Sequence, residues 1–321
     1  MPKLTHLIIL WSLLTLLLPF NSNAEEAPET YQLQNKFKSG QTIYLDLSTT
    51  AKGVVTDNSS EKPAQSPMDY KMGAVSSFLT KSINKDQWAN LEIGFHQLVI
   101  SGSTMGSATM DLAEKLGLNE RKINIQVSLT GDVKEQDNPS VKSTPMDNSV
   151  KSITRQMPYL KFPANAIPIG HTWHETKQIP LTGASKPVIS YSTYTLDKII
   201  ERDGEKIAVI SKKTIVNQKD IPVDSNSSSQ KNVNLVIKFV YKEYSINGQG
   251  IINFSIDQGR ILSVKDTQKT ILSMQGNTNI DKASFEQNTT QEFVQQISAS
   301  FTETNPSPAL ANDPSTDAAA K

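Results

Sequence analysis

The chain has 321 residues, with 32 Lys and Arg against 32 Asp and Glu, four His and no Cys. This neutral balance argues against a nucleic-acid-binding protein, which needs a positive excess to displace the counterions of the phosphates. It also gives an anionic membrane surface no electrostatic attraction. The absence of Cys excludes disulfides, thiolate nucleophiles and Cys-based zinc or iron–sulfur sites.

Residues 1–24 have the pattern of a signal peptide. Lys3 supplies a positive start, Leu7 to Leu18 form an apolar run, and Ser22-Asn23-Ala24 places small residues at the cleavage site. The apolar run is shorter than the ~20 residues that a membrane-spanning helix needs. We therefore expect cleavage after Ala24, export to the periplasm or beyond, and no transmembrane segment in the mature chain. Export without any Cys is more typical of a bacterial protein than of a eukaryotic extracellular one.

Strand signals dominate the mature chain. Apolar and polar residues alternate in five segments, at 43–47, 91–99, 123–129, 233–241 and 252–256. A period of two indicates one buried and one solvated face, which is typical of antiparallel sheets. We therefore predict a mainly β protein, in which antiparallel meanders form a curved sheet, a sandwich or a half-barrel with one or two short helices.

Three turn signals fall between these strands. Asp203-Gly204 and Asn247-Gly248 are dipeptides that tolerate the positive φ angles of tight hairpins, and Asp257-Gln258-Gly259 has the same turn chemistry. Together they predict a meander from about residue 188 to residue 275.

The remaining segments are less regular. Short helices are expected at 109–116 and at 147–158, the first closed by Gly117 and the second by Pro158. The spacing of Phe293, Ile297 and Phe301 suits a helix, but other features of 285–301 favour a strand, which is the structure that we expect.

Polar segments at 56–68 and 220–232 predict mobile hairpin loops. We divide the mature chain into an N-terminal β half at 25–160, a C-terminal β half at 161–304 and a disordered tail at 305–321. Whether the halves are one domain or two fused, similar units stays open.

Several motifs resemble those of exported bacterial β-rich proteins that have no established activity. One is Phe162-Pro163 followed by Ile167 to Trp173, and a second is the Gly248 to Ile261 segment with its Gly-x-Gly and Gly-Arg-Ile elements. Tyr31 to Thr42 matches the usual opening of these proteins. The resemblance implies an exported β protein, and it implies no catalytic residues.

Two motifs resemble a metal site and a catalytic nucleophile, and each also has a purely structural interpretation. His171 and His174 would share a face on a helix and bind a metal there, but Pro168 and Gly170 favour the start of a strand, which separates the two rings. Ser101 to Gly106 approaches a nucleophile elbow, but Thr stands where Ser is needed and the surrounding sheet is antiparallel.

Other candidates have structural interpretations. Gly248-x-Gly250 lies in an expected hairpin turn and lacks the third glycine of a phosphate-binding loop. The remaining candidates are acidic pairs that we expect to be solvated, one histidine expected on a strand surface and two tryptophans expected in the core: Asp197 with Glu201, Asp203 with Glu205, His96, Trp88 and Trp173.

No residue is therefore assigned a catalytic, cofactor-binding or metal-binding role. We expect an exported, non-enzymatic envelope protein with a binding or scaffolding role, whose partner is unknown: an envelope protein or an apolar ligand. One alternative is a carrier that holds an apolar ligand on the concave face of a curved β-sheet. A second alternative is a hydrolase whose site the sequence does not reveal.

Overall fold

The computed structural model describes nine parts of the chain: residues 28–102, 110–115, 117–119, 122–135, 160–179, 181, 184–223, 235–280 and 283–306. Most of these residues lie in antiparallel strands, as the alternation predicted. The expected signal peptide at 1–24 and the expected helix at 147–158 lie outside the described residues.

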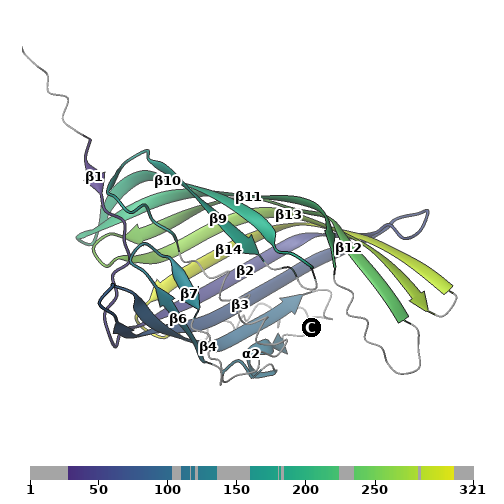
Figure 1. Cartoon of the computed structure of the whole chain (residues 1–321), viewed down its shortest axis with the longest axis horizontal. Coiled ribbons are helices and arrows are strands. Elements are labelled where there is room, and N and C mark those ends of the chain that lie inside the picture. The colour runs from purple at the N-terminus through teal and green to yellow at the C-terminus, as the bar shows by residue number, and fades with distance from the viewer. Residues whose placement is uncertain are drawn as a thin grey trace, which may run out of the picture.

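One sheet of twelve strands contains almost the whole fold (Figure 1). Its strand order is β7-β6-β4-β3-β2-β14-β13-β12-β11-β10-β9, with β5 also paired to β4, and the path does not close on itself. A separate pair, β1 with β8, completes the strands. The bounds are β1 Thr30–Tyr31, β2 Thr42–Asp57, β3 Ala64–Ile83, β4 Ala89–Gly102, β5 Met110–Asp111, β6 Lys122–Val127, β7 Val133–Glu135, β8 Ile167–Pro168, β9 Thr172–Ile179, β10 Val188–Arg202, β11 Glu205–Pro222, β12 Leu235–Ser255, β13 Arg260–Ile280 and β14 Ala283–Thr302.

Two of the predicted turns are confirmed. Asp203 and Gly204, at φ 53° and 78°, connect β10 to β11, and Gly259, at φ 63°, ends the turn between β12 and β13. The expected strand at 285–301 is also confirmed, because β14 runs through it and pairs with β13 and β2. This β14–β2 pairing joins the end of the chain to its beginning in one sheet.

The predicted turn at Asn247-Gly248 is wrong. β12 runs through it without a break, and Gly248 pairs with Thr214 of β11 on one side and with Gln268 of β13 on the other. The turn interpretation failed because neighbouring strands on both sides supply hydrogen-bond partners along the whole segment, which favours an extended backbone.

Two further expectations need shorter bounds. Among the described residues of the expected helix at 109–116, Leu112–Lys115 form the helix α2 and Met110–Asp111 form β5. Gly117, at φ 60°, lies close to the end of α2. The expected loop at 56–68 is shorter, because β2 reaches Asp57 and β3 begins at Ala64. Within 220–232, residues 224–232 lie outside the described ranges.

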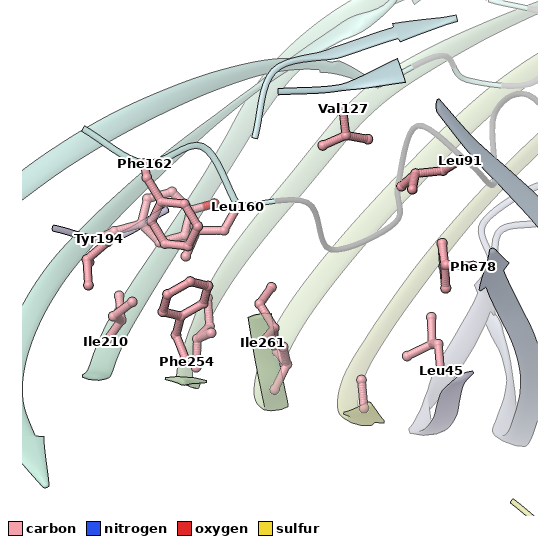
Figure 2. Packing of buried hydrophobic residues seen from close by; sticks show 14 of the residues in the cluster. Leu45, Phe78, Leu91, Val127, Leu160, Phe162, Tyr194, Ile210, Phe254 and Ile261 are labelled. Carbon is pink, nitrogen blue, oxygen red and sulfur yellow. The ribbon is translucent and has the colours of Figure 1, made fainter. Parts of the chain in front are cut away.

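Two segments outside the large sheet fill one end of its inner face. We call residues 30–37 and 160–168 the plug; β1 and β8 pair within it. Leu33, Leu160 and Phe162 of the plug are buried in the main apolar cluster. The Phe162 ring lies 4.6 Å from the Phe254 ring of β12 (Figure 2). We call the face of the sheet that meets the plug the inner face.

The plug also bridges the two edge regions of the sheet. Phe162 N donates a hydrogen bond to Thr130 O beside β6 and β7, and Trp173 Nε1 of β9 donates to Lys161 O. Lys161 forms an ion pair with Asp132. The end of the curved sheet that the plug covers is therefore held by both polar and apolar contacts.

Core packing around the plug predicts that substitution by Ala destabilises the protein much more at one position of β12 than at another. Phe254 is fully buried, whereas Ile251 is 51% exposed on the other face. Phe254→Ala should lower the free energy of unfolding by roughly 3–5 kcal/mol, as for other buried Phe residues, and Ile251→Ala should change it by about 0.5 kcal/mol or less. Denaturant unfolding of both variants measures the difference. Equal losses would show that the assignment of faces is wrong.

Candidate functional site

A row of polar side chains crosses the inner face next to the plug. Tyr194 of β10 pairs with Lys212 of β11, Lys212 with Gly250 of β12, and Gly250 with Asp266 of β13. Residues paired across antiparallel strands project to the same face. Lys212 and Asp266 therefore lie on the inner face, where the alternation of their strands would otherwise place apolar residues.

Lys212 and Asp266 form an ion pair that crosses β12. Lys212 Nζ lies 2.8 Å from Asp266 Oδ2, although the two residues are not on adjacent strands. Gly250, the residue between them, has no side chain to obstruct the contact. A Cβ atom at Gly250 would lie 3.1 Å from Asp266 Cβ and 2.6 Å from the Lys265 carbonyl oxygen, which is too close for an ordinary residue.

Asp266 is deeply buried and only partly satisfied. Its side chain is 3% exposed, and Oδ2 also accepts a hydrogen bond from Gln268 Nε2 at 3.0 Å. Within the described part of the chain, no group donates a hydrogen bond to Oδ1. This oxygen faces Gly248, whose ideal Cβ position lies 3.6 Å away. A buried carboxylate oxygen without a donor is costly, so Oδ1 is a natural place for a donor from outside the sheet.

A second polar group lies at the β9 end of the same face. Tyr194 Oη donates a hydrogen bond to Glu175 Oε2 at 3.0 Å, and Lys177 Nζ lies 3.2 Å from the same oxygen. Burial, together with the nearby Glu175 carboxylate, raises the pKa of Tyr194 far above its ordinary value. Tyr194 is therefore a neutral hydrogen-bond donor at any ordinary pH. We call Glu175, Tyr194, Lys212, Asp266 and Gln268 the polar cluster.

Half-buried apolar side chains continue the inner face beyond Asp266. Asp266 pairs with Ile297 of β14, and the same row continues through β2 to Met72 of β3 and Ile100 of β4. In the next rows, the rings of Tyr70 and Phe293 meet edge to face at 6.4 Å. All five side chains are only partly buried. We call this set the apolar wall: Ile297 and Phe293 of β14, Tyr70 and Met72 of β3, and Ile100 of β4.

The two histidines of the His-x-x-His motif lie at the surface, and most of the serine motif lies outside the described residues. His171 and His174 are both exposed, and the ring of His174 hydrogen-bonds Thr193 Oγ1. Among the described residues, no three His, Asp or Glu side chains gather as metal ligands would. Ser101 and Gly102 end β4, which is paired antiparallel to β3, and residues 103–106 lie outside the described ranges.

Other candidates are placed largely as expected. His96 is exposed and hydrogen-bonds Ser77 Oγ, while Trp173 is 8% exposed in the core and stacks on Tyr194. Trp88 is only half buried, with Lys134 over its ring, because it lies beside the exposed turn between β3 and β4. Three of the acidic residues lie at the surface: Asp197, Glu201 and Asp203. The fourth, Glu205, is half-buried and accepts a hydrogen bond from Ser255.

Sequence reasoning missed the polar cluster, although a signal for it exists. Lys212 follows Ile210, and Asp266 follows Val264, at the inward positions of alternating strands. Charges at such positions are rarely buried unless they are paired. The Gly248-x-Gly250 motif, which we had assigned to a turn, lies inside β12, where Gly250 leaves the space that the pair crosses and Gly248 lies under the Gln268 side chain.

Comparisons with known proteins give no assignment. No family model matches the chain, and no curated protein sequence matches it. Among solved structures, an outer membrane channel from Pseudomonas putida F1 aligns over 84% of this chain and 97% of its own, at 4% identity and a TM-score of 0.19. DynF from the dynemicin biosynthesis pathway of Micromonospora chersina aligns over 84% and 85%, at 7% identity and a TM-score of 0.15. At these scores neither similarity bears on fold or function. No helix in the described ranges has the length and apolarity needed to cross a membrane.

The buried ion pair predicts strong coupling between its two members. Lys212→Met should lower the free energy of unfolding by roughly 3–5 kcal/mol, because Asp266 would stay buried without its cation. Adding Asp266→Leu to that variant should restore much of the loss, since both charges are then gone. Denaturant unfolding of the single and double variants measures the coupling. Additive losses would show that Lys212 and Asp266 do not meet over Gly250.

Proposed function

We propose that this chain is an exported, non-enzymatic binding protein, and that the inner face of its curved sheet is the binding surface. The observation that carries the proposal is the division of this face beyond the plug: the polar cluster lies on one side and the apolar wall on the other. Such a surface suits a small amphipathic ligand, with its apolar body against the wall and its polar head at the cluster.

The chemistry of the polar cluster favours binding over catalysis. Lys212 and Asp266 neutralise each other, and Tyr194 keeps its proton and donates a hydrogen bond to Glu175. The cluster thus offers hydrogen bonds and fixed charges to a ligand, rather than an activated nucleophile beside a base. This supports a carrier, the function that the sequence left as an alternative to a general binding or scaffolding role.

The location and shape of the surface also fit a carrier. The plug covers the inner face at one end with a dense apolar core, and the apolar wall beyond it remains half-buried. An apolar side chain that is only partly buried gains free energy when a ligand covers it, at about 25 cal/mol per Å² of area. Export, predicted from residues 1–24, would place this carrier in the bacterial envelope or outside the cell.

Binding of an apolar fluorescent probe tests the proposal. Titration of the purified chain with N-phenyl-1-naphthylamine should give a saturable rise in emission at one probe per chain. Ile297→Lys, in the apolar wall, should weaken this binding by about tenfold or more, equivalent to about 1.4 kcal/mol.

The matched control changes the neighbouring residue on the opposite face. Gln296 is exposed, so Gln296→Lys should bind the probe as the unchanged chain does. Circular dichroism and thermal unfolding verify that both variants fold. Failure to saturate, or equal weakening in the two variants, would contradict an inner-face binding surface.

A further inference from the structure

We infer that the ligand's head group is an uncharged hydrogen-bond donor, such as a hydroxyl or a primary amide, which binds Asp266 Oδ1. The inference rests on the proposed binding role of the inner face and specifies the chemistry of the ligand. It follows from the one buried carboxylate oxygen of the polar cluster that no described group satisfies.

Hydrogen-bond accounting shows that the head group must be a donor. Asp266 Oδ2 already accepts from Lys212 Nζ and Gln268 Nε2, at 2.8 Å and 3.0 Å, whereas Oδ1 accepts from no described group. A carboxylate oxygen has only lone pairs to offer. A head group that only accepts hydrogen bonds, such as an ether, would leave Oδ1 unsatisfied and add a second unpaired acceptor.

Charge accounting shows that the head group is neutral. Lys212 balances Asp266, and Lys177 balances Glu175, so the region carries no net charge. An ammonium head would be an extra buried cation beside Lys212, and a carboxylate head would face the lone pairs of Oδ1. Buried charges without a partner are strongly disfavoured, so a neutral donor is the group that fits both constraints.

The side chain of Gln268 covers Asp266 Oδ1 on the side of Gly248. A Cβ atom at Gly248 would lie 2.9 Å from Gln268 Cγ and 3.6 Å from Oδ1, so Gln268 occupies the space over this glycine. A head group therefore reaches the buried Oδ1 by displacing the flexible side chain of Gln268. Ile297, the partner of Asp266 on the next strand, begins the apolar wall, so a donor at Oδ1 places its apolar body on that wall.

Displacement of bound N-phenyl-1-naphthylamine by four compounds, each with a straight chain of about ten carbons, tests the inference. 1-Decanol should displace the probe at a concentration about tenfold or more below that of decyl methyl ether, because only the alcohol can donate to the carboxylate. Decylammonium and decanoate should both be weaker than 1-decanol. In a double variant, Lys212→Met with Asp266→Leu, 1-decanol and decyl methyl ether should displace the probe at similar concentrations.

The control removes an exposed ion pair between β13, the strand that carries Asp266, and β14. Lys269→Met with Glu292→Leu deletes the Lys269–Glu292 pair, both of whose side chains are 55% exposed, and it should keep the preference. If no probe binds, the proposed function fails. If the probe binds but alcohol and ether compete equally, Oδ1 meets only water and the inference alone fails. The inference also fails if the variant without Asp266 still prefers the alcohol, or if the unchanged chain prefers decylammonium or decanoate to 1-decanol.

Discussion

The rest of this structure depends on one constraint: a curved sheet that does not close must have its inner face covered by something other than its own strands. Residues 30–37 and 160–168 provide that cover at one end, where Leu33, Leu160 and Phe162 pack against the sheet. The same segments join the two edge regions, because Phe162 N donates to Thr130 O on one side and the Trp173 side chain of β9 donates to Lys161 O on the other. Beyond the plug the inner face changes character, and the polar cluster and the apolar wall begin there.

The Gly248-x-Gly250 segment links the fold to the proposed function. In a central strand, glycine weakens packing and often marks a place where another group approaches closely. Here Gly250 allows Lys212 to reach Asp266 across β12, and Gly248 allows the Gln268 side chain to lie against the strand beside Asp266. We expect the pair to stabilise the sheet only while both members are present, and it leaves Asp266 Oδ1 buried without a donor among the described residues.

The fold class could be predicted from the sequence because strand alternation and turn dipeptides are set by residues that are close together in the chain. Alternation identified β2, β4, β6 and β12, and Asp203-Gly204 identified a hairpin whose φ angles are both positive. Asn247-Gly248 has equally good turn chemistry but lies inside β12, because pairing with β11 and β13 outweighs a local preference. The polar cluster could not be predicted in this way. Lys212 and Asp266 are 54 residues apart, and only the strand order and the register bring them together.

The central claim is that the inner face binds an amphipathic molecule through Asp266 Oδ1. The most direct measurement is a crystal structure of the chain grown with 1-decanol. The account predicts the alcohol oxygen within about 2.5–3.0 Å of Oδ1, at hydrogen-bonding distance, with the alkyl chain against Ile297 and Met72. An alcohol bound elsewhere, or a water molecule at Oδ1 with the apolar wall uncovered, would contradict it.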